Sequence, residues 1–232
     1  MNIPLLRRVQ ARLRWRALLL CVCALVLLAA CAERSAKFSL LPPEAVILAF
    51  GDSLTYGTGA DPEASYPAVL ENLTKRKVVN AGVPGEVSRD GLARLPALLD
   101  EHRPGLLILC HGGNDMLRKL DPGELKESLR SMISMARQRN IPVLLIGVPE
   151  PKLALATAPL YAELAEETQV LFEGEILADV LQWPSTKHDM IHPNAAGYRK
   201  IAEAIYARLE RADLVEVGQR QALKELNQPS ST

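Results

Sequence analysis

The chain of 232 residues has the length of a single domain and can bury a sizeable core. Hydrophobic residues make up 48% and charged residues 23%, a balance that excludes an intrinsically disordered protein. The formal net charge is zero and becomes negative once the basic N-terminus is set aside, which argues against nucleic acid as a partner.

The N-terminus has a composition unlike the rest of the chain. Residues 7–16 hold five arginines and no acidic residue, and residues 17–30 are fourteen consecutive apolar residues. A membrane-spanning helix needs about 20 apolar residues, whereas a shorter run behind a basic segment is typical of a secretory signal peptide. The run ends in LLAAC. Small residues directly before Cys31 resemble the lipobox of bacterial lipoproteins, whose cysteine is acylated and becomes the first residue after cleavage.

We therefore expect residues 1–30 to be a lipoprotein signal peptide and Cys31 to carry a lipid that anchors the protein in the bacterial cell envelope, facing the periplasm. Ala32 rather than Asp follows the cysteine, which favours the outer membrane by analogy with other lipoproteins. The alternatives are an ordinary signal peptide cut near Ala30 and an uncleaved anchor. Removing the five arginines leaves 22 basic residues against 27 acidic ones, a net charge near −5. Besides Cys31 only Cys110 would remain, so we expect no internal disulfide and a buried, inert Cys110.

Strand and helix patterns alternate along the rest of the chain. Residues 31–43 predict a short tether, 44–212 the folded domain, and 213–232 a C-terminal tail. Continuous apolar runs, typical of strands buried on both faces, occur at 45–50, 77–82, 106–112, 142–148 and 170–173. Helical patterns occur at 65–76, 88–102, 121–140, 158–169 and 194–212, the second of them weakened by Gly91 and Pro96. The alternation predicts an α/β fold with a central parallel sheet of about five strands between two helical layers.

Polar residues lie where these strands end, at the edge on which parallel sheets form their sites. Ser53 follows the first strand in GDSLT, Asn114 follows the third in HGGND, and Asp189 and His192 precede the last helix in HDMIHPN. A serine attacks a carbonyl only when a base takes its proton and donors hold the oxyanion. On one loop, Asp189 can bind one imidazole nitrogen of His192 and leave the other for Ser53. The alternative is that this pair only caps the following helix.

The loops after the second and third strands contain the donor types of an oxyanion hole. Backbone N–H groups at Gly82 or Gly85 and the side-chain amide of Asn114 can all donate to an oxyanion. Glycine also allows positive φ and a close approach of the backbone to a substrate. Turn formation explains the same residues equally well, since such pairs are common in loops.

The segments FGDSLTYG, NAGVPGEVS, HGGND and DMIHPNAAGY, taken together in this order, resemble the four sequence blocks of the SGNH hydrolase (GDSL esterase/lipase) superfamily. Within it the chain looks most like the bacterial arylesterase, lysophospholipase and acyl-CoA thioesterase branch. The resemblance covers about residues 45–210. It implies a flavodoxin-like three-layer α/β/α fold and a serine-dependent reaction with no metal and no cofactor.

The resemblance also implies a role for each site residue. Ser53 is the nucleophile, with His192 as base and Asp189 as the acid of a catalytic triad. The oxyanion donors are the N–H groups of Ser53 and Gly85 and the amide of Asn114; Gly85 is preferred to the earlier glycine because the family's donor lies five positions after the Asn of this block.

Four other polar residues near these blocks are expected to be structural. Asp52 beside the serine is expected to form hydrogen bonds, and His102, His111 and His188 to be surface or satisfied polar histidines. Only His192 has the right spacing to an acidic partner. His111 stands where an acidic or apolar residue is more usual, which bears on the polarity beside Asn114.

We therefore expect a tethered serine esterase that hydrolyses small to medium acyl esters through an acyl-enzyme, with thioesters and lysophospholipids as further candidate substrates. Within the enzyme class the alternative is an O-deacetylase of cell-envelope carbohydrate, which the 4% content of aromatic residues disfavours. The alternative of another class is a non-catalytic envelope lipoprotein that binds ligands. Acyl chain length and oligomeric state are left open.

Overall fold

The structure, a computed structural model, describes residues 39–152 and 155–216. The predicted signal peptide, Cys31 and most of the tether and C-terminal tail lie outside these residues. Within the described part of the chain, no helix has both the length and the apolar character needed to cross a membrane.

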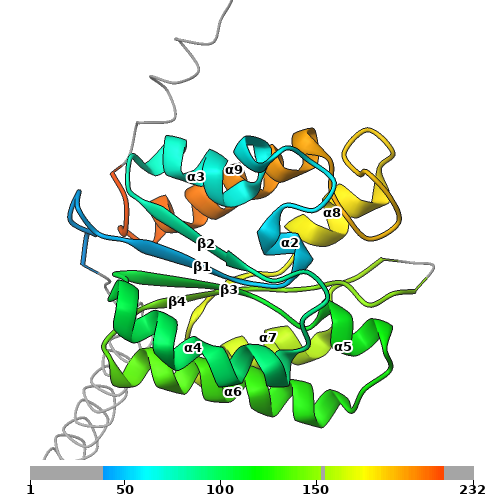
Figure 1. Ribbon diagram of the computed structural model, residues 1–232, viewed down its shortest axis with the longest axis horizontal. Coiled ribbons are helices and arrows are strands. Elements are labelled where there is room, and N and C mark those ends of the chain that lie inside the picture. Colours follow the sequence, from blue (N-terminus) through cyan, green and yellow to red (C-terminus); the bar gives the residue numbers. More distant parts are fainter. Residues whose placement is uncertain (1–38, 153–154, 217–232) are drawn as a thin grey trace, which may run out of the picture. The chain divides into compact units, whose positions relative to one another are not determined.

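Five parallel strands form one sheet in the order β2-β1-β3-β4-β5 (Figure 1). In chain order they are β1 (Ile47–Gly51), β2 (Val78–Gly82), β3 (Leu106–Cys110), β4 (Val143–Ile146) and β5 (Leu171–Glu173). Every residue of β1, β3 and β4 is buried, as their continuous apolar runs predict, whereas the edge strands β2 and β5 are more exposed. The predicted parallel α/β fold is confirmed.

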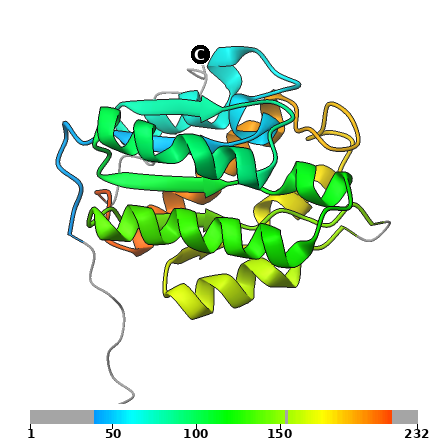
Figure 2. The same cartoon turned by 60° about the horizontal axis from the view of Figure 1, so that its bottom comes forward.

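Helices cover both faces of the sheet (Figures 1 and 2). One layer contains α3 (Tyr66–Thr74) and α9 (Ala195–Arg211), with the shorter α2 (Ser53–Tyr56) and α8 (Ile176–Gln182) beside them. The other contains α4 (Ser88–His102), α5 (Gly113–Leu117), α6 (Pro122–Gln138) and α7 (Pro159–Thr168). A single 3₁₀ turn, Pro62–Ala64, precedes α3. All five predicted helices are present, and the short helices α2, α5 and α8 were not predicted.

Local sequence signals fix several helix ends. Asp121 caps α6 by accepting from the Gly123 N–H, with Pro122 in the first turn, and Asn194 caps α9 by accepting from the Gly197 N–H at 3.0 Å. Helix α4 continues through Pro96 without a break. Tertiary packing therefore overrides the weak local helix signal there.

The core extends slightly beyond residues 44–212. Leu41, Leu214 and Val215 are all at most 5% exposed, and the Leu41 N–H donates to the Leu214 carbonyl at 3.0 Å. The two ends of the domain are thus bonded to each other. Cys110 is buried in β3, as predicted.

Candidate active site

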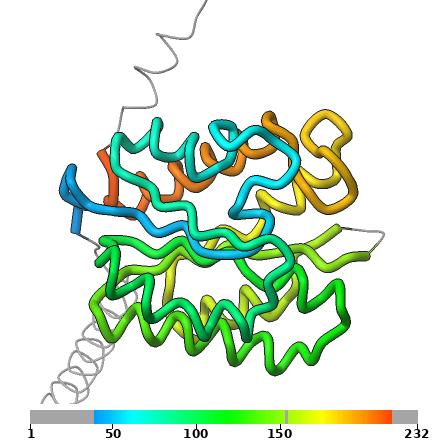
Figure 3. Tube along the Cα trace, in the orientation of Figure 1, coloured from blue at the N-terminus to red at the C-terminus, as the bar shows by residue number. Residues whose placement is uncertain are grey.

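The order of the strands reverses at β1, because β2 and β3 pair on either side of it. Parallel sheets bind ligands beyond the carboxyl ends of their strands at such a switch point. Figure 3 shows the chain leaving β1 and β3 at the same edge of the sheet. Ser53 follows β1 and Asn114 lies in α5 after β3, so the topology brings these two predicted site residues together.

Ser53 begins α2, immediately after β1. Asp52 caps this helix through its Oδ1, which accepts from the Leu54 N–H at 3.0 Å. Gly51 must lack a side chain, because a Cβ there would lie 1.9 Å from the Cys110 carbonyl oxygen on the neighbouring strand. Asp52 is 1% exposed, and burial raises its pKa. It has the structural hydrogen-bonding position expected of it, and it fixes the turn that presents Ser53.

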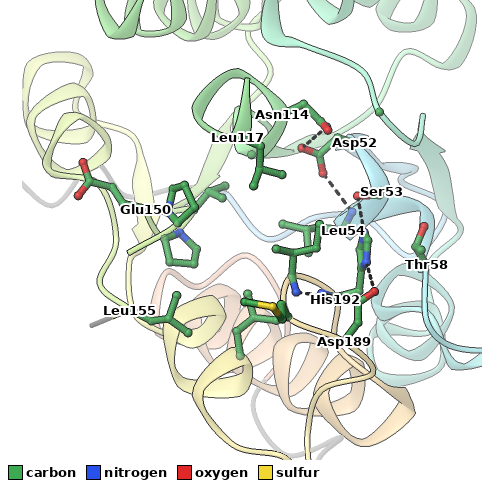
Figure 4. A pocket seen from close by; sticks show the side chains of 18 of the residues that line it. Asp52, Ser53, Leu54, Thr58, Asn114, Leu117, Glu150, Leu155, Asp189 and His192 are labelled. Atoms are coloured by element: carbon green, nitrogen blue, oxygen red, sulfur yellow. Dashed lines mark hydrogen bonds and ion pairs between the residues drawn. The ribbon is translucent and has the colours of Figure 1, made fainter. Parts of the chain in front are cut away.

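Ser53, His192 and Asp189 form one line of hydrogen bonds (Figure 4). The Nε2 atom of His192 lies 3.1 Å from the Ser53 Oγ, and its Nδ1 atom lies 2.8 Å from the Asp189 Oδ2. With Nδ1–H donating to the carboxylate, Nε2 is free to accept the serine proton. A serine that attacks a carbonyl needs this arrangement of base and orienting acid.

The loop between α8 and α9 holds Asp189 and His192 in a tight turn. The Asp189 Oδ1 accepts from the backbone N–H groups of Ile191 and His192, each at 2.8 Å. The His188 N–H in turn donates to the His192 carbonyl at 2.8 Å. Partial burial acts to raise the pKa of Asp189, but the hydrogen bonds from the His192 ring and the two backbone groups outweigh it and lower that pKa. The carboxylate therefore stays charged and orients the imidazole.

The predicted oxyanion donors border the same pocket as Ser53. Gly85 has φ +79°, and a Cβ there would meet only the Arg118 Nη2 at 3.8 Å, so one face of this residue is open. The amide of Asn114 donates to the Glu86 carbonyl at 3.0 Å and makes a longer contact of 3.4 Å with the Asp52 Oδ2. A backbone N–H and a side-chain amide are the donor types that stabilise a tetrahedral oxyanion.

Gly82, the other glycine of this loop, has a different environment. Its N–H donates to the Asn80 Oδ1 at 3.0 Å, and it is not among the pocket residues. A Cβ at this position would lie 2.1 Å from the backbone nitrogen of Tyr56. Gly82 therefore serves the packing of β2 against α2, which leaves Gly85 as the glycine of this loop that borders the pocket.

The pocket beside Ser53 has a volume of about 930 Å³. This is near the upper end of the usual range for small-molecule sites, roughly 300–1,000 Å³. Most of its surface is apolar, contributed by Leu54, Leu117, Val148, Leu155, Leu181, Met190 and Ile191. Figure 4 shows Leu155 and Glu150 on the side opposite Ser53 and His192, so the cavity extends well beyond these two residues.

The remaining histidines lie outside the pocket lining. His188 is exposed, and His102 pairs at 3.8 Å with Glu101 at the end of α4. His111 is fully buried, and its ring is hydrogen-bonded to Glu86 on another loop. Sequence reasoning did not predict this contact, and its one sequence signal is the unusual His before GGND. Among the described residues there is no group of three or more His, Cys, Asp and Glu side chains that could hold a metal ion.

The chain is similar to proteins of known family. Residues 49–200 match the GDSL-like Lipase/Acylhydrolase family. Thioesterase 1/protease 1/lysophospholipase L1 of Escherichia coli (strain K12) is 33% identical over 172 residues, which cover 71% of this chain and 83% of that protein. Esterase TesA of Pseudomonas aeruginosa is 33% identical over 207 residues, 84% of this chain and 98% of the relative.

Solved structures of esterases are also similar to this chain. The crystal structure of TesA has a TM-score of 0.66 at 30% identity and covers 72% of this chain and 99% of its own. AlinE4, described as an SGNH-hydrolase family esterase, has a TM-score of 0.58 at 34% identity and covers 73% of this chain and 96% of its own.

Proposed function

The chain belongs to the GDSL-like Lipase/Acylhydrolase family and is a carboxylic ester hydrolase, and we propose that Ser53 is its nucleophile. The observation that carries the proposal is the hydrogen-bonded series Ser53–His192–Asp189, which lines an apolar pocket. The series joins residues from opposite ends of the domain and contains a nucleophile, a base and the group that orients the base.

In the proposed reaction the Ser53 Oγ attacks the acyl carbonyl carbon while its proton passes to the His192 Nε2. Asp189 stabilises the imidazolium. The N–H groups of Ser53 and Gly85 and the amide of Asn114 stabilise the oxyanion. When the tetrahedral intermediate collapses, the alcohol leaves with the proton from His192, and the acyl group remains on Ser53. Water then attacks the acyl-enzyme, gives its proton to His192, and releases the carboxylic acid as the Ser53 hydroxyl is restored.

We propose esters of small to medium acyl chains as substrates. The apolar lining supports an acyl group better than a sugar, because His192 is the only aromatic ring among the described residues that line the pocket. Thioesters and lysophospholipids remain within the proposal, since they present the same acyl carbonyl and the Escherichia coli relative is named for both activities.

Labelling with a fluorophosphonate tests the nucleophile. The reagent attaches to an activated serine through the oxyanion geometry described above. We expect intact-protein mass spectrometry to show one adduct per chain, and peptide mapping to place it on Ser53. The Ser53→Ala variant should take up no label. A wild-type protein that stays unlabelled would support the non-catalytic binding lipoprotein instead.

We further propose that the protein is exported and anchored by a lipid on Cys31, on the sequence signals described above. Metabolic labelling with an alkyne fatty acid should mark the full-length protein in its bacterial host, and Cys31→Ser should abolish the label. Equal labelling of both proteins, or none of the wild type, would contradict the anchor.

A further inference from the structure

His111 is completely buried behind the pocket, where its ring contacts a second loop of the site. Its Nδ1 atom accepts from the Gly112 N–H at 3.0 Å, so the ring proton is assigned to Nε2. That Nε2 atom lies 3.1 Å from the Glu86 Oε2 and therefore donates to it. The Tyr161 hydroxyl donates to the His111 carbonyl at 2.7 Å. Both the backbone and the ring of His111 are thus held in place, just before Gly112, Gly113 and Asn114.

Glu86 is an equally fixed partner on the other loop. Its side chain is only 8% exposed, and its carboxylate receives two hydrogen bonds of 2.7 Å from Arg94. Arg94 itself lies over the Phe50 ring, 4.1 Å from the ring centroid. Burial alone would raise the pKa of Glu86, but the hydrogen bonds from His111 and Arg94, and the charge of Arg94, lower it to about 2. The carboxylate is therefore charged at any pH at which an esterase would be assayed.

Glu86 also connects Gly85 and Asn114, the two proposed oxyanion donors that come from loops other than that of Ser53. Gly85 directly precedes Glu86 in the chain. The backbone carbonyl oxygen of Glu86 accepts from the Asn114 Nδ2 at 3.0 Å. Its side chain binds His111, three residues before Asn114. A single residue thus joins the loop of Gly85 to the loop of Asn114 through both its backbone and its carboxylate.

Helix α4 leaves space for this contact only because residue 91 is glycine. A Cβ on Gly91 would lie 2.5 Å from the His111 Nε2 and 3.2 Å from the Glu86 Oε2. Glycine is unfavourable in the interior of a helix, yet α4 contains it at the point where it packs against the ring. The missing side chain at Gly91 therefore leaves the space in which the His111 imidazole reaches Glu86.

We propose that Glu86 and His111 are positioning residues that set the spacing between the Gly85 N–H and the Asn114 amide, so that both donate to one oxyanion. Neither residue lines the pocket, so neither touches the substrate. Oxyanion donors act mainly on the transition state, where the negative charge develops, and small misplacements weaken them strongly. The role rests on the proposed function, and its loss lowers kcat while leaving KM nearly unchanged.

A matched pair of substitutions tests this role. His111→Gln keeps an amide N–H near the position of Nε2, whereas His111→Met fills a similar volume without a donor. We expect His111→Met to lower kcat for p-nitrophenyl hexanoate by about tenfold or more with KM within about twofold of the wild type. Inhibition by hexylboronic acid, whose tetrahedral adduct occupies the oxyanion hole, should weaken by a similar factor. His111→Gln should restore most of both values.

Two further variants complete the test. Glu86→Gln is expected to show the same split between kcat and KM, and it decides the matter if the buried His111 variants do not fold. Glu173→Gln is the control, because it alters another shielded carboxylate, 12% exposed and paired with Arg208 at 3.2 Å, outside the two loops. Its kcat should match the wild type.

Equal kcat for the Gln and Met variants of His111, or a change confined to KM, would overturn the positioning role. So would a folded Glu86→Gln protein with wild-type kcat. An inactive wild type that also fails to react with a fluorophosphonate would overturn the proposed function and this role together, so the two failures are distinguishable.

Discussion

The side-chain amide of Asn114 donates to the backbone carbonyl of Glu86 over 3.0 Å, which joins the loop after β3 to the loop after β2. An amide has two N–H donors, and the other contact of this one, to the Asp52 Oδ2, is long at 3.4 Å. Glu86 can therefore hold Asn114 while the second N–H is left for the oxyanion of the proposed reaction.

Replacing Asn114 by alanine should lower kcat by roughly 10²–10³ and change KM much less, because the lost hydrogen bond is strongest in the transition state. Steady-state kinetics on a p-nitrophenyl ester measure both constants. Asn72→Ala is the control, since the Asn72 side chain is exposed and, within the described part of the chain, donates only to the Ala68 carbonyl in α3. A KM effect equal to the kcat effect would assign Asn114 to substrate binding instead.

Asp189→Asn should lower kcat by roughly 10³ or more while the protein stays folded. The Asn oxygen can still accept from the backbone N–H groups of the turn, but its NH₂ group would face Nδ1 and force the ring proton onto Nε2, toward Ser53. The same kinetic assay measures the loss. Asp100→Asn, which alters a carboxylate paired with Arg139 on the surface, should keep full activity. Full activity of Asp189→Asn would mean that His192 needs no orienting acid.

Leu155→Trp should shorten the acyl pocket, because Leu155 borders it on the side opposite Ser53. The kcat/KM for a p-nitrophenyl dodecanoate is expected to fall by about tenfold or more, since the added ring fills space that a long chain needs. The butanoate should be hydrolysed at nearly the wild-type rate and serves as the internal control. Equal losses for both esters would show that the acyl chain does not reach Leu155.

Glu86→Gln should change how stability depends on pH. The pKa of Glu86 is about 2 in the folded protein against a usual value of 4.5, so the wild type binds fewer protons at this site than the unfolded chain does. Its contribution to stability is complete above about pH 4.5 and is lost as the pH falls toward 2. Urea unfolding across this range should show the variant less stable at neutral pH and the two curves converging at low pH. A gap independent of pH would contradict the ionised, bonded carboxylate.

Sequence patterns predicted the sheet well because its central strands are buried on both faces. The runs at 45–50 and 106–112 match β1 and β3 to within two residues at each end. The helices α2, α5 and α8 were missed because each has only four to seven residues, too few to display an amphipathic period. Pro96 weakens the local helix signal of residues 88–102, yet α4 forms over this whole range and continues through the proline.

The candidate site was predictable only where its residues stand in short motifs. The spacing of Asp189 and His192 on one loop suggested their hydrogen bond, and the order of blocks suggested Ser53 and Asn114. The contact between His111 and Glu86 could not be predicted, because it joins two loops 25 residues apart and depends on the room left at Gly91. Pocket volume likewise depends on how distant loops pack.

The most direct test of the central claim is the initial rate of hydrolysis of p-nitrophenyl esters, from acetate to hexadecanoate at about pH 8, for the wild type beside Ser53→Ala. We predict measurable wild-type rates with an optimum at small or medium chains, and a loss in the variant on the order of 10³ or more for every ester. Equal rates in the two proteins would contradict Ser53 as the nucleophile, and with it the mechanism proposed for this chain.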